Sequence, residues 1–304
     1  HAAETIYENI ALRVMGDLDL MVPKEDALRA FEWVQTLGYR PSTKGNNDAG
    51  LNLDRYHHLF QLCREGSFPV ELHWTIHHSQ RPPILPVEEL WKRAEAIRFG
   101  QVKLLGLSLE DLLLHIAWHP SGHHLFEADL RPLCDIDWML SRTTSSRIQW
   151  PVLRETAQRW GWSRGIFLTL RIAHELFHTP IPAAIEKEVA AVPGDFVNGA
   201  CEHLLLRSDA AGALTLSTLR VWKSPTLAQK VREFFRGWIV PRGVMAHKYP
   251  VNPDSPLVYW YYLVRIRDIL RRHGRVSMRL LRGNDAHLAA WAEIKENMAR
   301  WIQS

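Results

Sequence analysis

Two aspartates near the N-terminus, Asp17 and Asp19, are one residue apart in an otherwise apolar stretch that ends at Val22. Successive side chains of a β-strand point to opposite faces, so we expect both carboxylates on one face and Leu18 and Leu20 on the core side. Like charges at this spacing repel each other unless a cation lies between them. The spacing therefore predicts a metal site on a strand.

A second segment, residues 68–76, repeats this alternation of apolar and polar side chains. Its apolar face is formed by Phe68, Val70, Leu72, Trp74 and Ile76. Glu71 and His73 share the opposite face. If the two strands are neighbours, Asp17, Asp19 and Glu71 converge into an oxygen-rich site that suits Mg²⁺ or Mn²⁺. Two such ions, roughly 3.5–4 Å apart, can hold the attacking and leaving oxygens of a phosphoryl or nucleotidyl transfer.

The order of these motifs resembles a known enzyme superfamily. Gly16-Asp17-Leu18-Asp19-Leu20, then a helix and a strand bearing Glu71, resembles the nucleotidyltransferases typified by DNA polymerase beta. A longer run of motifs is similar to a narrower, bacterial family of nucleotidyltransferases over residues 1–180. That run comprises Arg13, Gly16 to Val22, Leu37-Gly38-Tyr39, Glu71 to Trp74, Leu112 to His115, and His119.

The resemblance implies roles for particular residues. Asp17, Asp19 and Glu71 would be the catalytic and metal-binding residues, with Mg²⁺ or Mn²⁺ as cofactor and ATP or another NTP as substrate. Arg13, Gly16 and His73 would contact the nucleotide. The superfamily also carries a Gly-Gly or Gly-Ser turn upstream of the aspartates, or Lys-Gly in the narrower family. This sequence begins at His1, in a predicted helix 2–9. We therefore expect that the first strand and its glycine turn are missing from it.

The same residues permit other interpretations. Arg13 could neutralise Asp17 in a structural ion pair, and His73 could be a hydrogen-bonded histidine beside a sheet edge. His115, His119 and His123 are spaced by four, as in helical zinc sites of hydrolases. Pro120 and Gly122 interrupt that helix, however, and Glu does not follow His115, so we favour a helix that packs across the sheet. Further along, the sequence predicts structural ion pairs first, and substrate contacts second, for Arg131, Asp135 and Asp137.

The predicted fold is α+β, with a small mixed sheet followed by a mainly helical region. A helix 23–37 with an apolar stripe follows the first strand, and Gly38 ends it. Strands 56–63 and 68–76 follow a turn-rich loop (41–54), and after Arg81-Pro-Pro83 a helix 87–96 and a strand 97–104 close the sheet module. The sequence predicts a catalytic domain over residues 1–106 and a helical domain over 107–304. Ser108-Leu-Glu-Asp111 would cap the first helix of the second domain. Its further helices are predicted at 127–141, 151–160, 164–178, 185–190, 196–207, 227–238, 257–272 and 285–302.

Composition narrows the class of protein. Three widely spaced cysteines among 304 residues match neither a disulfide framework nor a zinc motif, which favours a reducing cytoplasm. Every apolar stretch is shorter than a membrane span requires. Between residues 219 and 282 there are fourteen Lys/Arg and three Asp/Glu, although the whole chain carries only +4. There, aromatic residues 259–262 adjoin Arg265, Arg267, Arg271 and Arg272.

This basic segment permits three interpretations. It could bind RNA, lie on an anionic membrane surface, or be an ordinary amphipathic helix. Taken together, the sequence predicts a Mg²⁺-dependent nucleotidyltransferase with an unidentified acceptor, for which RNA is slightly favoured. The alternatives are a catalytically inactive module of the same fold that binds RNA or protein, and a zinc-dependent hydrolase.

Overall fold

The computed structural model describes residues 2–7, 9–42, 49–53, 57–76, 85–127, 130–206, 221, 223–282 and 286–304. Most of the predicted turn-rich loop 41–54, the start of predicted strand 56–63, Arg81-Pro-Pro83 and the first residues of the basic segment lie outside this range. The chain divides into two compact units, each built from separate stretches of sequence. One unit comprises residues 14–87 and 223–275, and the other residues 1–13, 88–222 and 276–304. The predicted domain limits, 1–106 and 107–304, stay a prediction.

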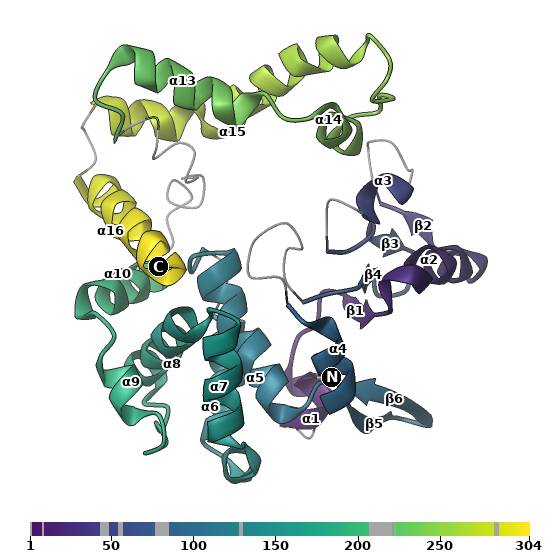
Figure 1. Ribbon diagram of the computed structural model, residues 1–304, viewed down its shortest axis with the longest axis vertical. Coiled ribbons are helices and arrows are strands. Elements are labelled where there is room, and N and C mark those ends of the chain that lie inside the picture. The colour runs from purple at the N-terminus through teal and green to yellow at the C-terminus, as the bar shows by residue number, and fades with distance from the viewer. Residues whose placement is uncertain are drawn as a thin grey trace. The chain divides into compact units, whose positions relative to one another are not determined.

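A four-stranded mixed sheet forms the centre of the first unit (Figure 1). Its strands are β1 (Leu18–Met21), β2 (Arg40–Pro41), β3 (Leu62–Cys63) and β4 (Val70–His73), in the order β1-β4-β3-β2. β1 and β4 are parallel, whereas β4 with β3 and β3 with β2 are antiparallel. This confirms the predicted small mixed sheet, in which the two polar-faced strands are neighbours.

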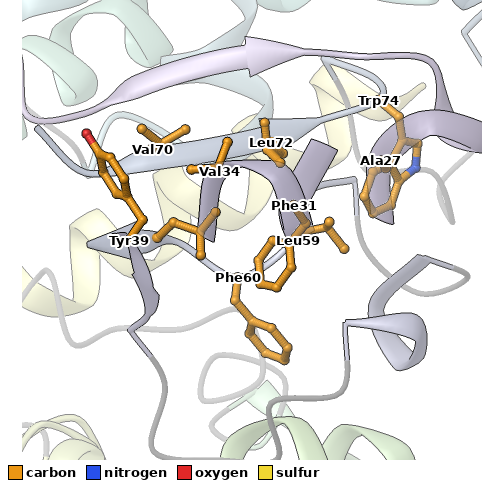
Figure 2. Close-up of a cluster of buried hydrophobic side chains, with 10 residues drawn as sticks. Ala27, Phe31, Val34, Tyr39, Leu59, Phe60, Val70, Leu72 and Trp74 are labelled. Carbon is orange, nitrogen blue, oxygen red and sulfur yellow. The ribbon is translucent and has the colours of Figure 1, made fainter. Parts of the chain in front are cut away.

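Apolar side chains from the sheet and from α2 (Ala27–Thr36) form the core of this unit. Figure 2 shows Phe31 and Val34 of α2 among Val70 and Leu72 of β4, with Leu59 beside them. α2 begins after a 3₁₀ turn at 24–26 and ends before Gly38, whose φ of +90° is the left-handed conformation that glycine adopts easily. α2 therefore lies on the apolar side of β4, so the polar side chains of β4 occupy the other face.

Four further helices belong to this unit, and the last of them extends beyond its limit at residue 275. They are α3 (Gly50–Leu53), α13 (Leu227–Trp238), α14 (Arg242–Lys248) and α15 (Val258–Arg282). Met245 of α14, Val251 and Val258 of α15 form a second small core, against which Tyr261 and Tyr262 pack. α13 begins with a capping box between Thr226 and Gln229.

The other unit is mainly helical. In chain order it contains α1 (Ala2–Tyr7), α4 (Val87–Arg93), strands β5 (Glu95–Phe99) and β6 (Val102–Gly106), α5 (Leu109–Trp118), α6 (Arg131–Leu140), α7 (Trp150–Arg159), α8 (Ser163–Phe177), α9 (Glu186–Ala190), α10 (Gly194–Leu206) and α16 (Ala286–Gln303). α8 is its central helix and packs against α5, α6, α10 and α16. The predicted helical character of this region is confirmed.

Three predictions about local structure were wrong in detail. The strand expected at 97–104 is instead an antiparallel hairpin, β5–β6, which forms its own two-stranded sheet. The chain reverses at Gly100, whose φ is +58°, so the apolar run pairs with itself. The first helix ends at Tyr7, and Asn9 caps a separate 3₁₀ turn. Leu20 was expected in the core but is 44% exposed, because β1 is an edge strand.

Among the described residues, we find no helix with both the length and the apolar character that crossing a membrane would require.

Candidate active site

The parallel pairing of β1 and β4 brings two predicted carboxylates together. Asp19 lies directly opposite Glu71 in the register, and Leu18 lies opposite Val70. Val70 and Leu72 point into the core, so Glu71 and His73 share the opposite face of β4. The local alternation of the two strands and their register are thus sufficient to place Asp19, Glu71 and His73 on one surface of the sheet.

The side chains of Asp19, Glu71 and His73 converge. His73 Nε2 lies 3.2 Å from Asp19 Oδ1 and 3.5 Å from Glu71 Oε2. One ligand atom of each residue lies within 4.8 Å of those of the other two. The Asp19 side chain is 64% exposed, whereas those of Glu71 and His73 are 21% and 18% exposed. The group is therefore anchored at one side and open to solvent at the other.

Neighbouring residues hold Glu71 in place. Gln61 Nε2 donates a hydrogen bond of 3.1 Å to Glu71 Oε1, and His58 Nδ1 lies 4.0 Å from Glu71 Oε2. The rings of His57 and His58 also lie beside His73, with centroids 5.5 and 5.1 Å from it. The sequence reasoning missed Gln61 and His58. Their position on the strand predicted to precede β4 was the signal that could have placed them beside Glu71.

His73 has an unusual protonation equilibrium. Burial favours the neutral ring, but hydrogen bonds to Asp19 and Glu71 favour the protonated ring and raise the pKa of His73 to about 9. In the absence of another cation, an imidazolium at this point offsets part of the repulsion between the two carboxylates. This cluster attracts positive charge.

The structure places the other predicted site residues differently. Asp17 is half-buried and precedes the first residue of β1, and it is not part of the converging group. A side chain at Gly16 would meet nothing within 4 Å, so the backbone there is open to approach. The predicted roles of Asp17 and Gly16 stay predictions.

Arg13 is bound elsewhere. Its Nε lies 2.9 Å from Asp135 Oδ1 and its Nη2 lies 2.8 Å from Asp135 Oδ2, a bidentate ion pair in the helical unit. Tyr7 donates a hydrogen bond of 2.8 Å to the same carboxylate. The alternative in which Arg13 simply neutralises Asp17 is therefore not what the structure shows. The ion-pair prediction holds for Asp135, and a contact of Arg13 with nucleotide stays a prediction.

The donor set of the converging group fits a divalent cation. Two carboxylates are hard oxygen donors of the kind that Mg²⁺ and Mn²⁺ prefer. Asp19 and Glu71 come from two strands held in fixed register, so they need little rearrangement to share an ion.

His115, His119 and His123, which lie in the described part of the chain and were considered above as a zinc site, do not form a converging group of ligands. α5 continues into a π-helical turn, residues 119–123, and the ring centroids of His115 and His119 are 6.0 Å apart, those of His119 and His123 5.5 Å apart. Among the residues the structure describes, three or more potential ligands from His, Cys, Asp and Glu converge only at Asp19, Glu71 and His73. Asp137, also predicted as structural, accepts hydrogen bonds from Ser141 and Thr179.

A family of uncharacterised nucleotidyltransferases matches residues 1–178, more than half of the chain. The protein belongs to this family. The match includes β1, β4 and the converging group, as well as the helices from α1 to α8. α9 and everything after it lie beyond the matched region. No curated protein and no solved structure is significantly similar to the chain.

Proposed function

We propose that this protein is a Mg²⁺-dependent nucleotidyltransferase that moves an NMP from an NTP to an acceptor and releases pyrophosphate. The observation that carries the proposal is the juxtaposition of Asp19 and Glu71 on neighbouring parallel strands, inside the region that matches the family. Among the described residues, this is also where potential metal ligands converge. An inactive binding module would need no such arrangement of carboxylates.

Asp19 and Glu71 would hold the metal, and Asp17, two residues before Asp19, would approach it from the start of β1. A bound Mg²⁺ or Mn²⁺ would neutralise the triphosphate and polarise the α-phosphate. Gln61 would keep Glu71 oriented through its hydrogen bond. His73, in contact with both carboxylates, would be a further ligand or a donor to a phosphate oxygen.

The transfer exchanges one bond to the α-phosphorus for another. An acceptor oxygen attacks the α-phosphorus of the NTP, and the bond from that phosphorus to the bridging oxygen of the β-phosphate breaks. Pyrophosphate leaves with the electron pair, and Glu71 accepts the proton of the acceptor. Because little covalent chemistry is left to the protein, positioning and charge neutralisation supply most of the rate enhancement.

Among possible acceptors, the basic charge of residues 219–282 slightly favours RNA over a small molecule or a peptide. A cytoplasmic location accords with an NTP substrate and with three cysteines that are free thiols in the structure.

Incubation with α-labelled NTPs and Mg²⁺ tests the activity, with transfer of label and release of pyrophosphate as the readouts. Asp19→Asn and Glu71→Gln should each abolish both, because each removes a negative charge while preserving the shape of the side chain. Binding of Mn²⁺, followed by its electron paramagnetic resonance signal, should weaken in parallel without any acceptor being known.

Matched controls exist in the same unit. Asp26→Asn at the half-buried N-cap of α2 and Glu32→Gln at an exposed position within α2 make the same chemical changes outside the converging group. Both should retain metal binding and transfer. Equal loss in the controls, or full Mn²⁺ binding and activity in Asp19→Asn, would contradict the proposal.

A further inference from the structure

α15 carries an outward face that is both apolar and basic. Tyr259, Trp260, Leu263 and Leu270 are 58%, 63%, 57% and 52% exposed. Arg267 and Arg271 are exposed too, and the positions 260, 263, 267, 270 and 271 fall on one side of a helix. The opposite side, with Val258, Tyr261 and Tyr262, packs on the core that includes Met245 of α14. The outward apolar residues are therefore not needed for that core.

α13 has a similar character. Leu227, Val231 and Phe235, four residues apart, lie along one stripe and are 78%, 45% and 48% exposed. Arg232, also exposed, lies away from this stripe. In an ordinary surface helix the apolar stripe is buried and the charged face is in water. Here a substantial part of the apolar stripe is in water as well.

The charge of the surrounding segment has one sign. Residues 219–282 carry eleven more positive than negative charges, while the rest of the chain carries seven more negative than positive charges. Within α15, Asp268 is paired with Arg267 and accepts a hydrogen bond from Tyr249, so it offsets one arginine only. Arg271 adds a further charge to the outward face. A partner of this face must offer negative charge next to an apolar phase.

We infer that the outward faces of α13 and of the first part of α15 bind the surface of an anionic lipid membrane. Basic helices with exposed Leu, Phe and Trp lie in the interface, with apolar side chains among the acyl chains and Lys or Arg at the anionic headgroups. RNA accounts for the arginines and aromatic rings, but single-stranded RNA is bound by stacking on rings rather than by leucine or valine. Leu227, Val231, Leu263 and Leu270 are the residues that favour lipid.

Co-sedimentation of the full chain with vesicles tests this inference. Vesicles of phosphatidylcholine with phosphatidylglycerol should bind the protein, and vesicles of phosphatidylcholine alone should bind it much more weakly. Leu263→Gln/Leu270→Gln should weaken binding at least about tenfold, because two apolar side chains no longer leave water. Arg267→Gln/Arg271→Gln should weaken it by about twenty-fivefold at low salt, since each basic residue near an anionic surface contributes roughly a factor of five.

Matched controls use exposed residues of the same types elsewhere. Leu37→Gln/Leu205→Gln and Arg29→Gln/Arg154→Gln should bind vesicles as the unmodified chain does. The same proteins are titrated with a fluorescent single-stranded RNA. Failure to bind the anionic vesicles, or binding that the α15 variants leave unchanged, would overturn the inference. RNA binding that depends on the arginine pair, without vesicle binding, would assign the face to RNA instead. Both binding assays are carried out without nucleotide or Mg²⁺, so their outcomes are independent of the proposed transferase activity.

Discussion

The carboxylates of the helical unit and those of the sheet differ in their burial and in their partners. In the helical unit Asp111 and Asp135, with side chains at most 1% exposed, each accept bidentate hydrogen bonds from an arginine, Arg93 and Arg13 respectively. Ser108 and Tyr7 each donate one more. On the sheet, Asp19 and Glu71 face each other and a histidine, and Asp19 is largely exposed.

The difference separates structural carboxylates from those available to a ligand. A buried carboxylate is tolerated when a guanidinium and further donors compensate for its lost hydration. Two carboxylates placed side by side at an accessible surface instead raise the local affinity for cations. Both types lie within the family-matched region, so membership of the family alone does not tell them apart.

The largest expected effect is on activity, and it distinguishes the accessible carboxylates of the sheet from the buried ones of the helical unit. Asp19→Asn should lower nucleotidyl transfer by about a thousandfold or more, because electrostatic stabilisation of the transferred phosphate is lost. Its unfolding free energy should change little, since the side chain is 64% exposed. Single-turnover transfer and urea denaturation measured on the same preparation check both parts. If Asp19→Asn lost stability but retained transfer, Asp19 would be a structural carboxylate rather than one available to a ligand.

The second effect is on stability. Asp135→Ala should lower the free energy of unfolding by about 3–5 kcal/mol, because Arg13 keeps its charge in a partly buried position without its acceptor. Tyr7 would lose its hydrogen bond as well; burial and that bond now raise the pKa of its phenol. Urea denaturation gives the magnitude.

A double-mutant cycle sharpens that result. Arg13→Met/Asp135→Leu should cost clearly less than the sum of Arg13→Met and Asp135→Leu, because no uncompensated charge remains. If folded Arg13→Met also lost transfer at saturating NTP, the predicted contact of Arg13 with nucleotide would gain support over a structural role.

How far the sequence predicts this molecule depends on the range of the interactions. Alternation along β1 and β4 and the stripe on α2 are local, so the strands, their polar faces and most helices were predictable. That the two polar-faced strands could be neighbours was also predictable, but their parallel pairing, with Asp19 opposite Glu71, is a finding of the structure.

Long-range partners were not predictable in the same way. Arg13 is four residues from Asp17 in sequence, yet its carboxylate is Asp135, 122 residues away. Gln61 reaches Glu71 only because β3 pairs with β4. The β5–β6 hairpin shows the same limit, since one apolar run can join a sheet or fold back on itself, and only tertiary contacts decide between the two.

A third, intermediate effect concerns a second ion pair of the helical unit, which is buried to a similar degree. Lys295 of α16 is 2% exposed and is bound to Glu127, which is 25% exposed. Burial lowers the pKa of Lys295 and raises that of Glu127, although each partially offsets the other. Lys295→Met should cost about 1–3 kcal/mol, less than Asp135→Ala, because only Glu127 loses a partner, whereas Asp135→Ala leaves both Arg13 and Tyr7 without their acceptor. Thermal and urea unfolding of Lys295→Met and Lys295→Met/Glu127→Leu measure it; equal costs in both would show that the unpaired carboxylate of Glu127 carries no penalty.

The smallest effect depends on pH. Glu89 accepts hydrogen bonds of 2.7 and 2.9 Å from Arg159 and one of 3.2 Å from Arg93, and these lower its pKa below the ordinary value of 4.5. A carboxylate whose pKa is lower in the folded state stabilises the fold above its unfolded-state pKa. This contribution disappears as the pH falls through the folded-state pKa.

Glu89→Gln should therefore cost less than about 1 kcal/mol at pH 7, given the partial exposure of these side chains. The difference from the unmodified chain, measured by urea denaturation across the acid range, should shrink towards zero below pH 4.5. A difference that stayed constant with pH would mean that the charge of Glu89 plays no part, and that Arg159 and Arg93 stabilise α4 only by packing.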